Sequence, residues 1–221
     1  ENTPKDRKNR EEILKKLQTQ LFSSMIEGDL KSVVHIYRSF TDNSSIEQFY
    51  ERILNPAMAE IGTMWADGSL SIATEHVASN TAQSLIKIIG ENHKRSNLSK
   101  GKIILTTPVG EEHCISCNII ESLLLSKGFT TFNLSPSTPA ASLVEFIKTI
   151  HPTAVLVSVT LEDNIRSAQR LVNKIVDLNK KLPIYVGGQA LHENKSRFSA
   201  TIIESDTGLE QIPKILSKRS I

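Results

Sequence analysis

The second half of this chain opens with KIILTTPVGEEHCIS, residues 102–116. Residues 102–107 are β-rich and apolar, and a helical pattern begins near residue 114. Short strand-type runs then alternate with helical stretches to the end of the chain. This alternation is typical of a parallel sheet covered on both faces by helices. Strands are predicted at 102–107, 129–134, 154–159, 184–186 and 201–203, and helices at 114–127, 140–150, 163–180 and 207–217.

Five strands over about 120 residues predict a flavodoxin-like, doubly wound α/β domain over residues 101–221. The ligands of such domains lie beyond the carboxyl ends of the strands. The loops after Thr107, Ser158 and Val186 are therefore the places to search for a site.

Residues 9–92 have a different periodicity. Apolar residues recur at helical spacing throughout, and Asp29, Ser45 and Gly68 stand at helix boundaries. Pro56 lies inside one pattern and should kink or restart that helix. Four amphipathic helices with short links predict a four-helix bundle over 9–92, with a polar linker following it at 92–100.

Composition narrows the class of protein. The 221 residues carry a net charge of +2, which is too small to indicate nucleic acid on its own. We expect a cytoplasmic protein without a membrane span, because there is neither a signal peptide nor an apolar run of about 20 residues. The chain starts at Glu1 rather than methionine, so we expect it to be a fragment of a longer protein.

The loop after the first strand carries a candidate metal ligand. Residues two apart in an extended loop face the same side, so Glu111 can hydrogen-bond one imidazole nitrogen of His113 while the other binds a metal. On its own this triplet is more often an ordinary loop histidine. The next loops add a hydroxyl at Ser158, and at Gly187-Gly188 two positions without side chains, where a ligand can approach closely.

Together these loops resemble the cobalamin-binding domain of methionine synthase, corrinoid methyl carriers and mutases. Its pattern is Asp-x-His-x-x-Gly, then Ser-x-Leu, then Gly-Gly. Here glutamate replaces the aspartate, Ser116 stands at the glycine, and the middle motif is stretched to four residues. The resemblance implies cobalamin as the cofactor and His113 as the cobalt ligand. It also implies that the nucleotide tail of the cofactor enters beside Ser158, Thr160, Gly187 and Gly188.

The helical half resembles one group within this family, the CarH/LitR-type light-sensing regulators. They carry a tryptophan and, about ten residues later, a Glu-His pair above the upper face of the corrin ring. This chain has Trp65 followed by Glu75-His76. The resemblance spans roughly residues 10–205 and implies cofactor contacts by these three residues. One departure is Ala66, where those regulators place a second histidine.

Two functions follow from the resemblance. The first is a regulatory photoreceptor that acts in transcription regulation and senses light through adenosylcobalamin held between the helical cap and the α/β domain. The second is a corrinoid methyl carrier that holds methylcobalamin within a methyltransferase system. Neither makes this chain an enzyme by itself. A homo-oligomer is expected, as is contact with DNA only through a partner or through a domain missing here.

Other motifs support competing interpretations. Cys114-Ile115-Ser116-Cys117 is a CxxC motif at a helix start, which is typical of a redox pair. With His113 the two cysteines also supply three ligands for zinc, without an obvious fourth. The basic residues of Lys5–Arg10 could touch DNA, although interleaved acids favour a solvated helix.

Overall fold

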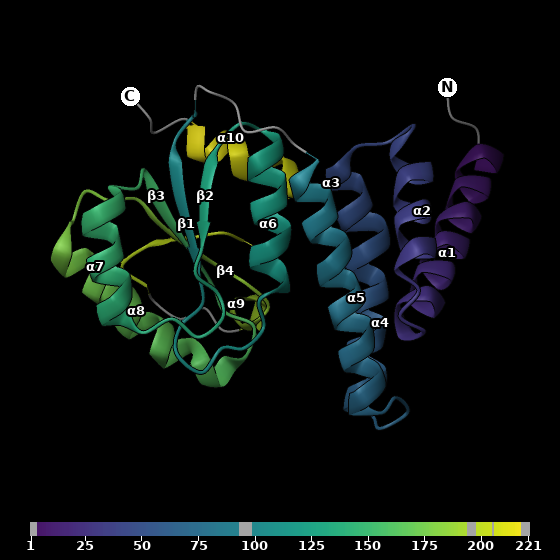
Figure 1. The fold of residues 1–221 in the computed structure, drawn as a ribbon, viewed down its shortest axis with the longest axis horizontal. Helices are drawn as coiled ribbons and strands as arrows, with labels where there is room; N and C mark the ends of the chain where they lie inside the picture. The colour runs from purple at the N-terminus through teal and green to yellow at the C-terminus, as the bar shows by residue number, and fades with distance from the viewer. Residues whose placement is uncertain (1–3, 93–98, 194–197, 205, 218–221) are drawn as a thin grey trace. The chain divides into compact units, whose positions relative to one another are not determined.

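The computed structural model describes residues 4–92, 99–193, 198–204 and 206–217. The chain forms two compact units, Glu1–Ile89 and Gly90–Ile221 (Figure 1). Six positions of the predicted linker, 93–98, lie outside the described residues. No helix among the described residues is both long enough and apolar enough to cross a membrane.

The first unit is helical, as predicted. Its helices are α1 (Pro4–Ile26), α2 (Leu30–Thr41), α3 (Ile46–Phe49), α4 (Asn55–Ala66) and α5 (Ile72–Glu91). The Asp29 side chain caps α2 by accepting a hydrogen bond from the Ser32 N–H, and Ser45 forms a capping box with Gln48 at α3. These caps supply acceptors for amide groups that have no partner within their helix.

Pro56 restarts a helix, as expected. A π-helical segment, Tyr50–Leu54, joins α3 to α4, and the proline lies in the first turn of α4, where its missing N–H leaves no bond unmade. The buried apolar residues of the unit come from every helix. They include Leu21, Met25, Val33, Phe49, Tyr50, Ile53, Leu54, Ile61, Ala78, Ala82, Leu85 and Ile89.

The second unit is a doubly wound α/β domain. Its strands are β1 (Lys102–Thr106), β2 (Thr130–Asn133), β3 (Ala154–Ser158), β4 (Ile184–Gly187) and β5 (Thr201–Ile202). All pair in parallel, in the order β2-β1-β3-β4-β5. This is the flavodoxin-like order, so the predicted fold is confirmed. The order reverses between β1 and β3, where ligands bind in such sheets.

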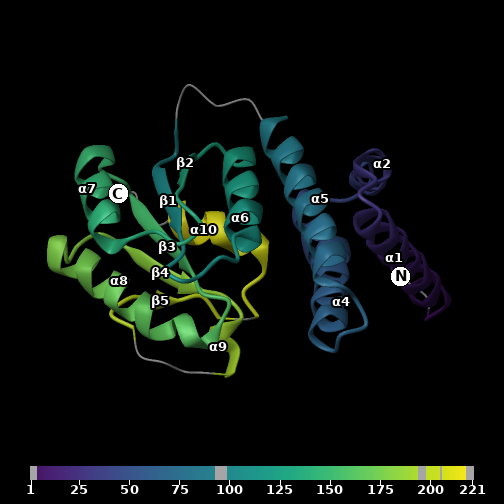
Figure 2. The same cartoon turned by 60° about the horizontal axis from the view of Figure 1, so that its bottom comes forward.

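Helices cover both faces of this sheet. They are α6 (Ile115–Ser126), α7 (Ala140–Ile150), α8 (Ile165–Leu178), α9 (Ala190–Glu193) and α10 (Ile212–Ser217). Figure 2 shows α7 and α8 on one face and α6 and α10 on the other. The short α9 (Ala190–Glu193) was not predicted. Two 3₁₀ turns, Glu162–Asn164 and Leu209–Gln211, stand at the starts of the helices predicted over 163–180 and 207–217, so α8 and α10 begin later than predicted.

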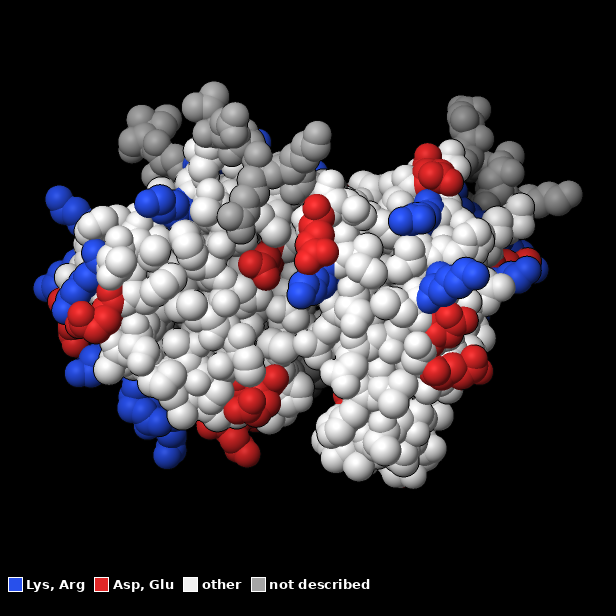
Figure 3. Space-filling model, in the orientation of Figure 1, with Lys and Arg blue, Asp and Glu red and all other residues white. Residues whose placement is uncertain are grey.

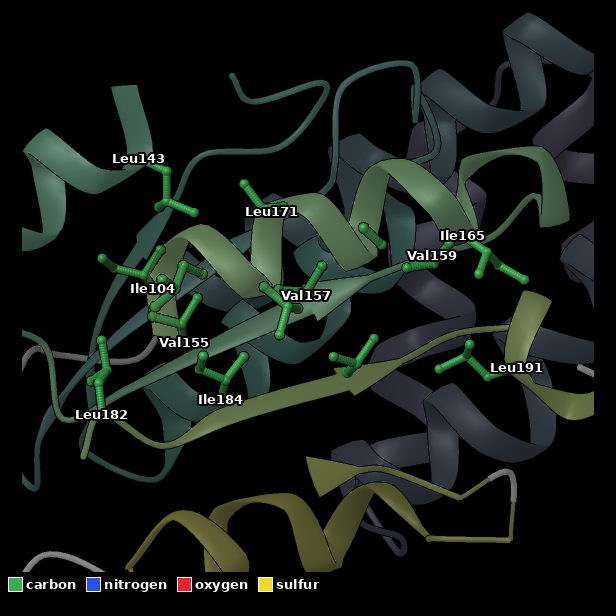
Figure 4. Packing of buried hydrophobic residues seen from close by; sticks show 14 of the residues in the cluster. Ile104, Leu143, Val155, Val157, Val159, Ile165, Leu171, Leu182, Ile184 and Leu191 are labelled. Atoms are coloured by element: carbon green, nitrogen blue, oxygen red, sulfur yellow. The ribbon is translucent and has the colours of Figure 1, made fainter. Parts of the chain in front are cut away.

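Side chains along each strand alternate between two cores. Val155 and Val157 of β3, and Val159 directly after it, face the core built with α7 and α8 (Figure 4). Ala154 and Leu156 face the other core, which includes Cys117 of α6 and Ile212 of α10. Because successive residues of a strand point to opposite faces, Ser158 belongs to the face of α6 and α10.

Candidate functional site

Two loops meet at the carboxyl ends of the neighbouring strands β1 and β3. The loop after β1 holds Glu111 and His113, and the loop after β3 holds Thr160 and Leu161. The strands are paired at Thr106 and Val157, so the loops emerge side by side. The helix that follows the second loop also contacts the first loop. The Ser167 hydroxyl, in the first turn of α8, donates a hydrogen bond to the Val109 carbonyl at 3.0 Å.

Glu111 joins the two loops. Its side chain has no solvent exposure. Oε2 accepts hydrogen bonds from the backbone N–H groups of Thr160 and Leu161 at 2.9 and 3.0 Å, and from the Asn164 amide at 3.0 Å. Oε1 accepts from the backbone and side chain of His113. A buried carboxylate with this many donors is compensated for its loss of water.

His113 is oriented by this carboxylate. The distance from its Nδ1 to Glu111 Oε1 is 2.6 Å, and about half of its side chain is exposed. The contact that the sequence pattern suggested is therefore present. With Nδ1 held by a carboxylate, Nε2 is the nitrogen that can bind a metal, and the carboxylate makes it more basic.

The ionisation of Glu111 reflects the same contacts. Burial alone would raise the pKa of this carboxyl. Hydrogen bonds from the Leu161 N–H, Asn164, His113 and the Thr160 N–H outweigh burial, and the pKa lies below its ordinary value of 4.5. Glu111 is therefore an anion near neutral pH and can stabilise positive charge at His113 or at a metal.

Replacing Glu111 with glutamine should weaken both the fold and the site. Both carboxylate oxygens of Glu111 accept hydrogen bonds, so the NH₂ group of a glutamine would face N–H donors, either from His113 or from the loop after β3. We expect a loss of about 2 kcal/mol in the free energy of unfolding and a metal affinity at His113 weakened by about 10- to 100-fold. Urea unfolding and spectroscopic titration measure the two effects. The control is Glu112→Gln at the exposed neighbouring residue. Equal behaviour of the two variants would contradict the anchoring role.

The stability of the protein should depend on pH through the same group. A carboxyl whose pKa is lowered by folding adds stability that is fully present above the unfolded value. This contribution is lost as the pH falls from about 4.5 through the lower folded pKa. Urea unfolding between about pH 6 and 3 should therefore show a decline that Glu111→Gln lacks. Parallel decline in both proteins would assign the acid sensitivity to other groups.

Asn164 is a site residue that sequence reasoning missed. Its side-chain amide donates to Glu111 Oε2 at 3.0 Å and to the Gly110 carbonyl at 3.3 Å. Gly110 is in the left-handed region at φ 91°, and a Cβ there would lie 3.0 Å from Asn164 Oδ1. No spacing rule marks an asparagine six residues after Ser158. Its role depends on how the two loops fold together.

Ser158 ends β3 with an unpaired hydroxyl. Its residue is 7% exposed, and its Oγ has no hydrogen-bond partner. A buried hydroxyl without a partner costs roughly 1–3 kcal/mol. Ser158 pairs in register with Gly187 of β4, so this hydroxyl stands next to a position that has no side chain. An unpaired buried hydroxyl beside open backbone marks a place where a ligand group could bind.

The two glycines act differently. Gly188 is at φ 123°, and a Cβ on it would lie 2.3 Å from the carbonyl oxygen of Val159. Its missing side chain therefore lets the end of β4 pack against the backbone that follows β3. Gly187 instead faces Ile203, whose Cβ lies 3.4 Å from where a Gly187 Cβ would be. The fold therefore excludes a side chain at position 188, whereas a Cβ at position 187 would make only an ordinary van der Waals contact.

The cysteines do not form a reactive pair. Cys117 is buried and donates a weak hydrogen bond to the Thr106 carbonyl at 3.7 Å. Burial raises the pKa of its thiol to about 12. A thiol that stays protonated is a poor nucleophile, so the redox interpretation is not supported. Within the part of the chain that the structure describes, no group of three or more His, Cys, Asp or Glu residues could hold a metal.

The remaining predicted contacts lie in the helical unit. Trp65 is 47% exposed near the end of α4. On α5, Glu75 accepts hydrogen bonds from His76 Nδ1 at 2.6 Å and from the Ser79 hydroxyl at 2.5 Å. Ile72 and Val77 of the same helix are also exposed. Contact of Trp65, Glu75 and His76 with a cofactor stays a prediction.

Charge around the α/β site is mainly acidic. Glu112, Glu162 and Asp163 are exposed on its two loops, with Arg166 nearby in sequence on α8. Figure 3 shows acidic side chains at the lower edge of this unit, with basic side chains farther along the same edge. Such a surface does not attract a polyanion such as a nucleoside triphosphate. It is compatible with a ligand that is neutral or cationic overall.

These residues fit a corrinoid. An imidazole with one nitrogen fixed by a carboxylate suits cobalt. The unpaired Ser158 hydroxyl and the open backbone at Gly187 suit the tail of a large cofactor. His113 would hold the metal, and Ser158 with the glycine loop would hold the tail.

Comparison with known proteins agrees with this fit. Two family models, both described as B12 binding domain, match residues 17–89 and 101–209. Trimethylamine corrinoid protein 1 of Methanosarcina acetivorans is 27% identical over 150 residues, which cover 64% of this chain and 68% of that protein. The trimethylamine corrinoid protein of Methanosarcina barkeri is 23% identical over 175 residues, covering 76% of this chain and 80% of that protein.

A solved structure, the monomethylamine corrinoid protein of Methanosarcina barkeri, shares the fold. It aligns with a TM-score of 0.72 at 11% identity, over 92% of this chain and 98% of that chain. Methionine synthase of Mycobacterium leprae is 21% identical over 204 residues, which are 86% of this chain and 17% of that protein. These relatives are named corrinoid proteins and methionine synthase, so the particular closeness to CarH/LitR-type proteins is not shown.

Proposed function

We propose, on the premise that both B12 binding domains are present in this chain, that it is the corrinoid carrier of a methyltransferase system. The observation that carries the proposal is the Glu111–His113 pair at the carboxyl end of β1, with Nδ1 to Oε1 at 2.6 Å. The relatives support it, because several are named corrinoid proteins for methylamines. The chain itself would not be the catalyst.

In this proposal the residues of the α/β unit hold and tune the cofactor. A bound corrinoid cobalt supplies a centre that accepts a methyl group and gives it up. His113 would provide a nitrogen ligand to the cobalt, and Glu111 would fix its tautomer and stabilise positive charge on it. Asn164 and the amide groups of Thr160 and Leu161 keep Glu111 in place. Methylcobalamin is the form that this function requires.

The partners in this proposal are methyltransferases. One would deliver the methyl group from its donor, and another would remove it to an acceptor. A homo-oligomer and an indirect link to DNA, both expected from the sequence, stay predictions. So does the light-sensing function with adenosylcobalamin, which depends on Trp65, Glu75 and His76.

One experiment separates carrier from sensor. The protein is loaded with hydroxocobalamin, reduced to the Co(I) state with titanium(III) citrate, and exposed to isotope-labelled methyl iodide in the dark, which forms the cobalt–methyl bond and releases iodide. The carrier function predicts that label is retained on the protein in the dark and released to homocysteine when a cobalamin-dependent homocysteine methyltransferase is added. In parallel, the adenosylcobalamin-loaded protein is run on size exclusion before and after light. A light-driven change in size, with no labelled product, would establish the sensor instead.

A further inference from the structure

Three neighbouring strands place a row of residues on the α6 and α10 face of the sheet. Ser158 of β3 pairs with Gly187 of β4. On β5, Ile202 pairs with Val186, and the Ile203 N–H bonds the Val186 carbonyl at 2.8 Å, so Ile203 follows beside Gly187. The row is therefore Ser158, Gly187, Ile203.

The direction of each side chain supports this row. Ile202 packs with the core of α7 and α8, whereas Ile203 packs with the core of α6 and α10. Ser158 faces the side of Leu156, which is in the core of α6 and α10. Hence the unpaired Ser158 hydroxyl and the Ile203 side chain share one face, separated by the glycine between them.

Ile203 occupies part of the space that the glycine leaves open. A Cβ at position 187 would lie 3.4 Å from Ile203 Cβ and 4.0 Å from its Cγ2. The isoleucine thus stands directly over the open backbone of Gly187. The Ile203 side chain is only partly buried. A ligand group that enters beside the unpaired Ser158 hydroxyl and extends over Gly187 would therefore contact it.

We propose that Ile203 is a specificity-determining residue that limits the size of the base carried on the nucleotide tail of the bound corrinoid. The inference rests on the proposed corrinoid binding and deepens it. A branched side chain that is held by a strand on one side and by core packing on the other cannot withdraw from the space over Gly187. The accepted base must therefore fit between Ser158 and Ile203.

The test compares three corrinoids that differ only in the tail. These are cobinamide, which has no base, the benzimidazolyl cobamide, and cobalamin, whose dimethylbenzimidazole is larger by two methyl groups. Dissociation constants come from absorption titration in the dark with wild type, Ile203→Ala and Ile202→Ala. Ile202→Ala is the matched control, since it removes the same side chain from the opposite face.

The expected result is a change in selectivity. Ile203→Ala should shift the ratio of the two dissociation constants, cobalamin over benzimidazolyl cobamide, by about tenfold in favour of cobalamin. Cobinamide binding and the ratio in Ile202→Ala should match wild type. An unchanged ratio in a folded Ile203→Ala protein would overturn the proposal. So would a wild type that binds cobinamide as tightly as both full cobamides.

Two further variants protect the test. Ile203→Val removes a single methyl group and should shift the ratio in the same direction by a few fold, without unfolding the domain. Gly187→Ala should weaken both full cobamides while cobinamide binding is kept, and equal weakening of all three would overturn the row as a tail site. Failure of corrinoid binding, on which the proposed function rests, looks different, because the wild type then binds none of the three corrinoids. Failure of the carrier function alone is seen in the methyl-label experiment and leaves these ratios unchanged.

Discussion

His113→Ala is expected to leave the cobalt of a bound corrinoid without a nitrogen ligand from the protein. The imidazole is held by Glu111 at 2.6 Å, and nothing else on this loop offers a neutral nitrogen. Corrinoid affinity should fall by about 100-fold or more, because losing the metal ligand His113 should cost at least as much as losing Glu111, the residue that orients it. In the electron paramagnetic resonance spectrum of bound Co(II) cobinamide, which carries no base of its own, the nitrogen splitting should disappear.

The control for this variant is His35→Ala, at an exposed position of α2. It should keep both the nitrogen splitting and the affinity. Free imidazole added to His113→Ala should restore the splitting, because it can occupy the space of the lost side chain. With cobinamide bound, splitting that persists in His113→Ala without added imidazole would assign the cobalt ligand to another residue.

Gly188→Ala should have the largest effect on the fold. Its Cβ would lie 2.3 Å from the Val159 carbonyl oxygen and 2.8 Å from the Val159 nitrogen. Both are backbone atoms, which cannot move away as the end of a flexible side chain can. The left-handed φ of 123° adds strain for any residue but glycine. We expect a loss of about 4 kcal/mol or more in the free energy of unfolding, or no folded protein.

The matched control is Gly62→Ala in α4, where a Cβ meets nothing within 4 Å. That substitution should raise the stability by roughly 0.5–1 kcal/mol, because alanine is the better helix former. Thermal unfolding of both variants, followed by circular dichroism, makes the comparison. A Gly188→Ala melting temperature equal to that of Gly62→Ala would show that β4 does not pack against Val159 in this way.

The sequence predicted the fold well because two independent patterns agreed. Strand runs alternating with helical stretches leave few options besides a parallel sheet, and helix-type periodicity before residue 92 separates a helical unit. Helix boundaries at Asp29 and Ser45 were visible because capping needs particular side chains. The short α9 could not be seen, since four residues carry no period.

The site was predictable only in part. Glu111 and His113 lie two residues apart, so local geometry foretells their contact. Asn164 lies 53 residues from Glu111, and only the folded loops bring them together. The choice between carrier and sensor depends on Trp65, Glu75 and His76. These residues are exposed or partly exposed on helices, and the sequence pattern does not show what group each of them contacts.

The anchoring of Glu111 has a consequence for protein engineering. Its five donors come from both loops, and three of them are backbone amides. Transplanting only a glutamate and a histidine to another sheet of this type would therefore produce a buried charge without its backbone donors. A functional transplant must include both complete loops, the one after β1 and the one from the end of β3 through Asn164, so that Glu111 keeps all its hydrogen-bond donors.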